Sequence, residues 1–444
     1  MKNFNLKARL AGMGFLEFAV WGSYLTSLGA YLAGIGQAEH IAIFYAIQGI
    51  VSIFMPALIG IVADRWIQAQ KTLSLCHLIA GAFMLAAGLY GLSTPEPSIG
   101  ILFSLYTVSV AFFMPTIGLS NSVAYSALER AGLDTVKHFP PIRVFGTIGF
   151  ICAMLFVNFT GYQNTAAQLV CSGILSFALT LYALTMPKCP VSKGGHKSLS
   201  EALGLKAFTL FKDKHMAVFF IFSMLLGVAL QITNGFANPY IQSFGFVDEF
   251  TDAWGVKNAN ALISISQMSE TLCILLIPFF LKRYGIKTVM LMAMTAWVFR
   301  FGLFGFGDPG HGLWMLIASM IVYGIAFDFF NVSGSLYVDK KTTDDIRSSA
   351  QGLFMVMTNG IGASVGTLVA QQIINHNVYS KAAGMAQIEG WHTSWLIFAG
   401  YALVVAVLFF IVFRDSDHKD KETKKEEKAD IKEAETFASI DTDI

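Results

Sequence analysis

Long apolar runs, separated by short charged or polar segments, fill the sequence between residues 9 and 413. Because a helix needs about 20 predominantly apolar residues to cross the hydrocarbon core of a bilayer, each run predicts one membrane span. The runs cover residues 9–32, 41–63, 72–91, 99–127, 139–160, 166–186, 214–244, 258–281, 286–306, 311–337, 348–374 and 393–413. The pattern therefore predicts an all-α integral membrane protein with twelve transmembrane helices.

The connections between these runs differ in positive charge. Those on one side of the membrane, together with both ends of the chain, hold nearly all of the 30 Lys and Arg residues, whereas those on the other side hold only Lys257 and Lys381. In membrane proteins the excess of Lys and Arg lies in cytoplasmic connections. We therefore expect both termini in the cytoplasm.

The longest internal connection divides the chain into two halves. We expect an N-terminal half of six helices at 1–186, a cytoplasmic linker at 187–213, a C-terminal half of six helices at 214–414 and a charged, disordered cytoplasmic tail at 415–444. The segment GIVADRW at 60–66 is weakly echoed by KRYGIK at 282–287. Paired halves around a site at the bilayer midplane are typical of secondary transporters.

Composition excludes several classes of protein. Hydrophobic residues make up 55% of the chain and charged residues only 13%, about half of the usual ~25%. The net charge of +1 and the lack of a basic patch argue against nucleic-acid binding. The five Cys form no CxxC motif, no P-loop motif is present, and His and carboxylate residues do not gather as an enzyme site requires. We therefore expect no metal, no cofactor, no nucleic-acid partner and no enzymatic activity.

Five ionisable residues lie well inside the predicted spans: Glu17, Arg143, Glu270, Arg300 and Asp328. Each costs about 2.5–3.5 kcal/mol at the bilayer centre unless it has a partner or faces a wet cavity. One interpretation is a set of structural contacts, in which Glu17 pairs with Arg143 and Arg300 pairs or snorkels near the outer end of its span. The other is a transport pathway, in which a carboxyl takes a proton on one side of the membrane and releases it on the other.

Polar and aromatic residues accompany these charges at helical spacing, so each group projects from one face of its helix. The groups are Arg143 with Thr147, Gln231 with Asn234, Gln267 with Glu270, and Tyr323 with Phe327 and Asp328. Amides and carboxylates can bind hydroxyls and ring nitrogens, and an aromatic pair offers a surface on which a flat ring can stack. Interhelical hydrogen bonding and packing are the alternative. The combination favours a site for a neutral, polar, partly aromatic solute.

Several segments carry a family resemblance in both halves. FPPIRVFGTIGF (139–150), LQITN (230–234), SISQMSET (264–271) and AFDFFN (326–331) closely resemble bacterial nucleoside permeases of the NupG type, the nucleoside:proton symporters of the major facilitator superfamily. The resemblance covers nearly everything from residue 5 to residue 414. It implies a major facilitator fold in the cytoplasmic (inner) membrane of a bacterium and proton-coupled uptake of nucleosides. We expect a monomer.

The resemblance also implies roles for individual residues. Nucleoside binding is expected at Arg143, Thr147, Gln231, Asn234, Gln267, Glu270, Tyr323, Phe327 and Asp328. Within this set we infer that Asp328 or Glu270 carries the proton. Glu17 departs from the family, in which some members have Gln at this position, and we expect it to alter proton coupling or to pair with Arg143. Asp64 and Arg65 in GIVADRW match the superfamily's loop between the second and third spans, where they would latch helix ends in one state of the cycle. A proton symporter for sugars or other polyols is one alternative function, and a non-transporting membrane sensor or enzyme is another.

Overall fold

The computed structural model describes residues 2–189, 205–343 and 346–413. Every regular element within these ranges is helical, as the sequence predicts. Most of the expected linker, and the whole of the expected tail at 415–444, lie outside the described residues.

The helices that precede the linker form the N-terminal bundle. They are α1 (Lys2–Gly22), α2 (Leu28–Gly34), α3 (Ile41–Arg65), α4 (Ala69–Ser93), α5 (Ile99–Arg130), α6 (Thr135–Phe159) and α7 (Ala167–Leu184), with single 3-10 turns at Ala38–His40 and Tyr162–Asn164. Each of the long helices from α3 to α7 covers one of the predicted apolar runs. The first run is divided between α1 and α2.

The first predicted span is interrupted, although the sequence predicts one continuous helix at 9–32. α1 ends at Gly22, and residues 23–27 form turns before α2 begins. Serine side chains compete with the helical hydrogen bonds of the backbone, and the Ser23 hydroxyl donates to the carbonyl oxygen of Ala19 at 2.8 Å. The Thr26 and Ser27 hydroxyls donate instead to the side chains of Asn260 and Gln168 on other helices. The Tyr45 hydroxyl donates to the carbonyl oxygen of Leu25 at 2.6 Å, which satisfies a backbone group at the interruption.

The helices that follow the linker form the C-terminal bundle. They are α9 (Lys214–Ser243), α10 (Trp254–Lys257), α11 (Ala259–Phe306), α12 (Leu313–Lys341), α13 (Arg347–Met355), the π-helix η5 (Val356–Gly362), α14 (Ala363–Ile374), the π-helix η6 (Asn375–Tyr379) and α15 (Met385–Val412), with 3-10 turns at Leu205–Lys212 and Phe244–Phe246. α13, η5, α14 and η6 run on as one membrane segment.

Ten helical segments of the described chain are long and apolar enough to cross a membrane. One of them, α11, contains two predicted spans and turns at Gly285, whose φ of 78° is outside the helical range. With α11 counted as two spans and α1–α2 as one interrupted span, the structure is consistent with the twelve predicted. The last span begins at Met385 and not at 393, because Ile388 and Trp391 are buried in the bundle.

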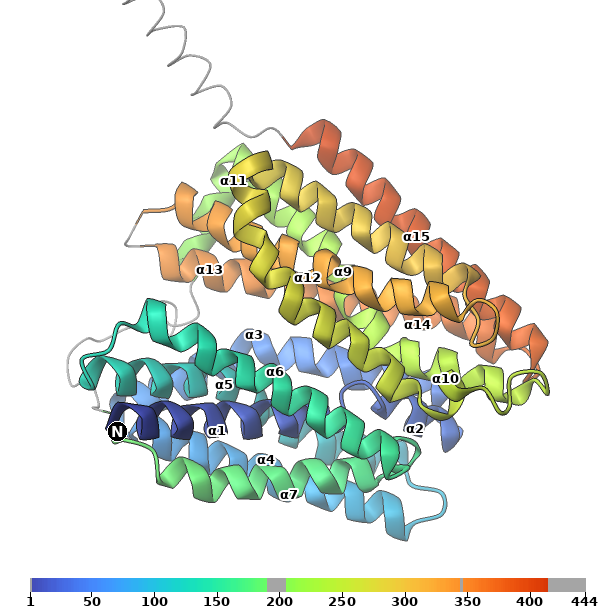
Figure 1. Ribbon diagram of the computed structural model, residues 1–444, viewed down its shortest axis with the longest axis horizontal. Helices are drawn as coiled ribbons and strands as arrows, with labels where there is room; N and C mark the ends of the chain where they lie inside the picture. The colour runs from blue at the N-terminus through green and yellow to red at the C-terminus, as the bar shows by residue number, and fades with distance from the viewer. Residues whose placement is uncertain (1, 190–204, 344–345, 414–444) are drawn as a thin grey trace, which may run out of the picture.

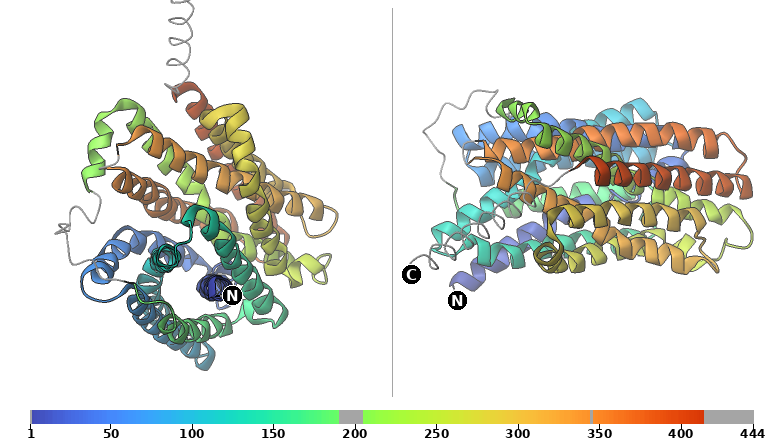
Figure 2. Two further views of the ribbon diagram at one scale, coloured as in Figure 1. Left: turned by 60° about the vertical axis from the view of Figure 1, so that its left-hand side comes forward. Right: turned by 90° about the horizontal axis from the view of Figure 1, so that it is seen from above.

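The two bundles lie side by side, with α1–α7 in blue to green and α9–α15 in yellow-green to red (Figures 1 and 2). α1 begins at one end of the molecule, which we call the terminal end, and α15 runs back towards that end (Figure 1). The charge pattern predicts that the terminal end faces the cytoplasm.

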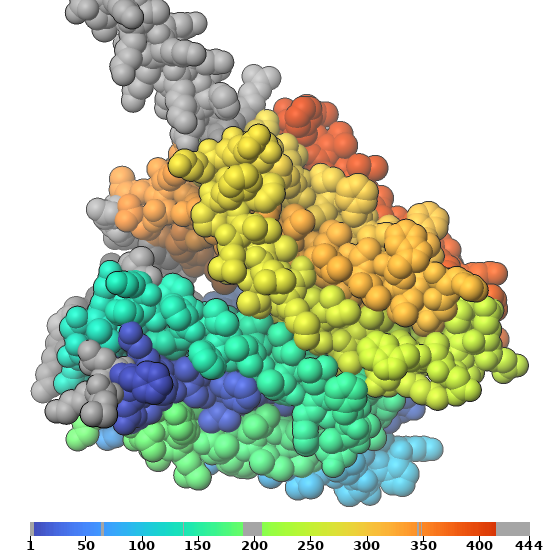
Figure 3. Space-filling view, in the orientation of Figure 1, coloured from blue at the N-terminus to red at the C-terminus, as the bar shows by residue number. Residues whose placement is uncertain are grey.

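Hydrogen bonds join the bundles at the opposite end, where α6 ends and α11 begins. Asn158 Nδ2 donates to Asn258 Oδ1 at 2.9 Å, Asn260 Nδ2 donates to the carbonyl oxygen of Met154 at 3.1 Å, and the Thr26 hydroxyl donates to Asn260 Oδ1 at 2.5 Å. Towards the terminal end the surface is hollowed between α6 and the C-terminal bundle (Figure 3). The bundles are therefore closed against each other at one end and parted at the other.

Candidate functional site

The N-terminal bundle contributes Arg143 and Thr147, which lie one turn apart on α6 and are both partly exposed. The Arg143 guanidinium carbon lies 4.0 Å from the centre of the Phe18 ring on α1. Gly149 lets α1 approach α6 closely, because a Cβ there would overlap the backbone of Phe15. The approach places an aromatic ring under the guanidinium, where a cation–π contact stabilises its charge.

On the C-terminal bundle, α12 presents an aromatic pair and a carboxyl group. The rings of Tyr323 and Phe327 stack with their centroids 5.6 Å apart and their planes inclined by 16°. Phe327 is partly exposed, whereas Tyr323 is buried and meets the Trp297 ring edge-on. Asp328, which follows directly, is 5% exposed. The pair therefore offers a partly open aromatic surface beside a carboxylate, a combination suited to a solute with a flat ring.

Charged side chains of both bundles lie near one another at their interface. The Arg143 guanidinium on α6 lies close enough to interact electrostatically with Glu270 on α11, Glu17 on α1 and Asp328 on α12. In the described part of the chain, no hydrogen bond or ion pair within 4.0 Å joins any two of them. Asp328 Oδ2 is buried without a hydrogen-bond partner. An unpaired buried group costs about 1–3 kcal/mol, and more when it is charged. This oxygen of Asp328 therefore needs a partner that the described residues do not supply.

The amides lie on neighbouring helices. Gln231 and Asn234 are partly exposed on α9, and Asn234 Nδ2 donates to Gln231 Oε1 at 2.6 Å. This bond leaves an amide donor on Gln231 and an acceptor oxygen on Asn234 for a solute. Gln267 is also partly exposed, one turn before Glu270 on α11. Among the described residues, no hydrogen bond links these amides to Arg143 or to the carboxylates. The charged groups and the aromatic pair thus form one neighbourhood, and the amides occupy accessible positions on α9 and α11.

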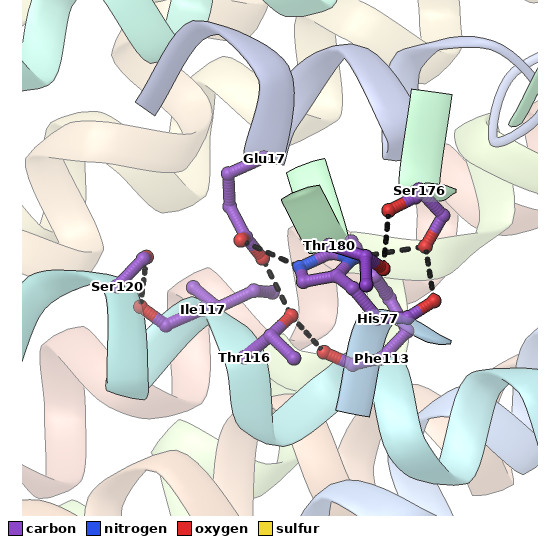
Figure 4. A network of polar contacts seen from close by, with 8 residues as sticks. All are labelled: Glu17, His77, Phe113, Thr116, Ile117, Ser120, Ser176 and Thr180. Atoms are coloured by element: carbon purple, nitrogen blue, oxygen red, sulfur yellow. Dashed lines mark hydrogen bonds and ion pairs between the residues drawn. The ribbon is translucent and has the colours of Figure 1, made fainter. Parts of the chain in front are cut away.

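Glu17 pairs with His77 inside the N-terminal bundle (Figure 4). In the described part of the chain, no ion pair within 4.0 Å joins it to Arg143. Its Oε2 lies 2.9 Å from His77 Nε2, with both side chains fully buried. The Thr116 hydroxyl lies 2.6 Å from Glu17 Oε1 and also 2.6 Å from the carbonyl oxygen of Phe113. On the other side of the ring, His77 Nδ1 lies 2.9 Å from the Ser176 hydroxyl, which also lies 3.0 Å from the carbonyl oxygen of His77. We call Glu17, His77, Thr116 and Ser176 the Glu17 network.

The sequence pattern did not identify His77. This residue lies inside the apolar run at 72–91, so it is a sixth ionisable residue within a predicted span. Its position alone was a signal that it needs a partner, because an ionisable group in a span is costly without one. The partner itself depends on packing, since Glu17 and His77 are 60 residues apart in the chain.

Arg300 is buried and does not snorkel to the membrane surface. It is 2% exposed, one guanidinium nitrogen donates to the carbonyl oxygen of Ser319 at 2.8 Å, and its guanidinium carbon lies 4.3 Å from the centre of the Tyr323 ring. It also donates to the Ser266 hydroxyl at 3.4 Å, and among the described residues no acid lies within 4.0 Å of it. Arg300 packs against Tyr323, and so supports the aromatic pair.

The expected latch cannot be placed, because the side chains of Asp64 and Arg65 lie outside the described residues. Their backbone ends α3, and their role stays a prediction. Among the described residues, no group of three or more His, Cys, Asp and Glu is arranged to hold a metal ion.

Comparison with known proteins decides the family. Residues 4–418 match the model of the family described as nucleoside H+ symporter. The chain belongs to this family. It is 47% identical to the xanthosine permease of Escherichia coli (strain K12), over 94% of this chain and 98% of that protein. It is 46% identical to the nucleoside permease NupG of the same organism, over 92% of this chain and 96% of that protein.

The fold agrees with this membership. The crystal structure of the nucleoside transporter NupG matches with a TM-score of 0.83 and 46% identity, over 93% of this chain and 100% of that chain. The chain therefore has the major facilitator fold that the resemblance implies. It is a multi-pass transporter of the cytoplasmic membrane and not an enzyme.

Proposed function

We propose that the protein carries nucleosides into the cell together with protons, as a monomer that opens alternately to the two sides of the membrane. Membership of the nucleoside H+ symporter family supports this, as do relatives named as permeases for xanthosine and for nucleosides. The observation that carries the proposal is Asp328, a buried carboxyl with an unpartnered oxygen. It lies between the bundles, beside the stacked rings of Tyr323 and Phe327.

The chemistry of each side chain suggests a division of labour. Arg143 can donate to the base and the ribose. The amides of Gln231, Asn234 and Gln267 can both donate and accept, and the Thr147 hydroxyl lies on the same face of α6 as Arg143. Phe327 stacks on the base and is supported from behind by Tyr323. Asp328 and Glu270 carry the proton and hydrogen-bond ribose hydroxyls. The residues in these roles are Arg143, Thr147, Gln231, Asn234, Gln267, Glu270, Tyr323, Phe327 and Asp328.

Glu17 fits a coupling role less well than Asp328. Both of its carboxylate oxygens already have partners in the Glu17 network, and the side chain is fully buried within one bundle. Its assignment to proton coupling stays a prediction, and the geometry favours a structural role. Asp64 and Arg65 stay proposed as the latch at the end of α3.

The open terminal end fits the state that releases its cargo. In the proposed cycle a carboxyl takes a proton from outside, nucleoside binds, the bundles rock, and both leave at the terminal end. A difference of one pH unit supplies about 1.36 kcal/mol per proton. One proton per nucleoside would therefore sustain about tenfold accumulation.

Uptake of radiolabelled nucleoside into sealed proteoliposomes with an alkaline lumen tests the proposal. We expect accumulation above the external concentration, and we expect a protonophore to abolish it because it collapses the gradient. Free ribose should compete poorly, since it lacks the ring that stacks on Phe327. Strong competition by ribose would favour a symporter for sugars or other polyols. Chemical modification of the solute, or no entry at all, would contradict transport.

A further inference from the structure

Trp21 is an aromatic residue of the N-terminal bundle to which the proposed cycle gives no role. It lies in the last turn of α1 and is partly exposed, although most of its aromatic neighbours are buried. The rings of Phe18, Phe113 and Phe150 surround it, with centroids at 6.4, 6.2 and 6.1 Å. A large ring that is packed on several sides and open on another is a candidate contact surface.

The neighbours of Trp21 indicate where its open side faces. They come from α1, α3, α5 and α6, so these four helices enclose the indole within the bundle. α3 and α6 are also helices whose ends hydrogen-bond to the C-terminal bundle. Because the N-terminal bundle covers the other sides of the indole, we infer that its open side faces the space between the bundles.

A chain of hydrogen bonds fixes the orientation of the indole. Trp21 Nε1 donates to Gln48 Oε1 at 3.3 Å, and Gln48 Nε2 donates to the Tyr106 hydroxyl at 2.8 Å. Gln48 is 2% exposed and Tyr106 is fully buried, so water does not compete for these bonds. The indole N–H is thereby occupied. The ring can contact a solute only through its π surface.

Trp21 is contiguous with the proposed nucleoside site. The Phe18 ring lies between it and the Arg143 guanidinium. Phe150, which Trp21 meets edge-on, lies three residues beyond Thr147 and so on the same face of α6. The backbones of the two helices touch at this level, because a Cβ on Gly22 would overlap the backbone of Phe150. The indole is thus held beside the polar face of α6.

We propose that Trp21 is a further nucleoside-binding residue and that its π surface contacts the solute from the N-terminal bundle. This inference rests on the proposed function. Phe327 contacts the same solute from the C-terminal bundle, so a bound nucleoside touches an aromatic ring on each side of the interface. Gln48 acts as the positioning residue, because it holds the indole in place without a polar atom left for the solute.

Equilibrium binding of radiolabelled nucleoside to the purified full-length protein tests this role. We expect Trp21→Ala to weaken binding about three- to tenfold, as the loss of one aromatic contact would. Trp21→Phe should bind within about twofold of the parent, because a ring remains at the site. Gln48→Leu should give an intermediate loss, since the indole is retained but no longer fixed. Trp314→Ala is the matched control, because that indole is 62% exposed at the start of α12.

A second readout separates binding from packing. Nucleoside should quench the tryptophan fluorescence of the parent and of the Trp314→Phe variant, and the quenching should be smaller in Trp21→Phe. Equal affinity of the parent and Trp21→Ala would overturn the role of Trp21 and leave the proposed function standing. An equal loss in Trp21→Ala and Trp21→Phe with unchanged quenching would also overturn it, in favour of a packing role. No binding by the parent would overturn the proposed function, and this inference with it.

Discussion

Two buried acids in this protein have opposite surroundings. Glu17 lies inside the N-terminal bundle, and His77 and Thr116 contact its two carboxylate oxygens. Asp328 lies between the bundles, and one of its oxygens has no partner among the described residues. The first acid satisfies its hydrogen-bonding capacity within the fold. The second has a carboxylate oxygen to which a proton or a solute can bind.

The difference separates stability from transport. Removing one member of a buried hydrogen-bonded pair leaves the other buried and unpaired, which is strongly destabilising. Removing the charge of a carboxyl that has no partner should cost little stability, because its burial is already unfavourable. The sequence suggests that Glu17 and Asp328 both affect proton coupling, whereas their surroundings in the structure favour a structural role for Glu17 and a coupling role for Asp328. Breaking the Glu17 pair should therefore lower stability, whereas removing the Asp328 carboxyl should impair transport without lowering stability.

The largest effect is expected in the Glu17 network. Glu17→Leu leaves His77 buried without its partner and should lower the free energy of unfolding by about 3–5 kcal/mol. The double variant with His77→Leu should recover most of this loss, because the ionisable pair is then removed together. The Thr116 and Ser176 hydroxyls keep carbonyl acceptors on Phe113 and on residue 77. Thermal unfolding in detergent, followed by near-ultraviolet circular dichroism, measures both. A Glu17→Leu protein as stable as the parent would contradict the pairing.

Glu17→Gln tests the transport side of the same comparison. Glutamine keeps the size of the side chain and can still hydrogen-bond to His77 and Thr116, but it cannot exchange a proton. We expect normal accumulation of nucleoside under a pH gradient. Loss of accumulation in a stably folded Glu17→Gln protein would show that Glu17 takes part in proton coupling.

The next largest effect is expected at Asp328. Asp328→Asn should abolish uphill accumulation, so that a gradient of one pH unit gives a concentration ratio near one and not the about tenfold ratio expected for the parent. Exchange of nucleoside down its own gradient should persist, and thermal stability should be equal or higher. Glu270→Gln is the parallel variant on α11. If both variants accumulate nucleoside as the parent does, neither carboxyl carries the proton.

The sequence predicted the architecture well, because apolar runs report directly on membrane spans. The positions of Arg143, Glu270 and Asp328 within spans also marked the residues that the structure brings together. Helical spacing further placed Phe327 beside Tyr323, where the rings do stack. These features depend on residues near one another in the chain, or on a bilayer energy that acts on each residue separately.

The contacts that the sequence did not predict depend on which helix faces meet. Glu17 could equally have met Arg143, and only the rotation of α1 within the bundle turns it to His77. The interruption after Gly22 lies within an apolar run, and the Tyr45 hydroxyl that contacts it comes from another helix. The contact of Trp21 with Gln48 likewise joins α1 to α3. Pairings between helices are set by packing, which one sequence does not reveal.

A smaller effect is expected at the open aromatic surface of the site. Phe327→Ala removes the ring that is proposed to stack on the base and should raise the half-saturation concentration about three- to tenfold, with little change in the maximal rate. Phe299→Ala is the control, because that ring is 60% exposed and, among the described residues, makes no ring contact with Tyr323 or Phe327. Initial rates of uptake over a range of nucleoside concentrations measure both. An unchanged half-saturation concentration would remove Phe327 from the site.

The smallest effect is expected at an acid that is paired but exposed. The hydrogen bond that Lys257 donates to Asp252 at 2.7 Å, together with the lysine charge, lowers the pKa of the Asp252 carboxyl. A lowered pKa means that the pair stabilises the fold above the normal aspartate pKa of about 4, and that this contribution is lost as the pH falls through the lowered value. Solvent screens exposed pairs strongly, so Asp252→Asn should leave uptake and thermal stability unchanged between about pH 5.5 and 7.5. A marked loss of uptake or of thermal stability in this pH range would mean that an exposed ion pair matters as much as a buried one. Burial would then not explain the contrast between Glu17 and Asp328.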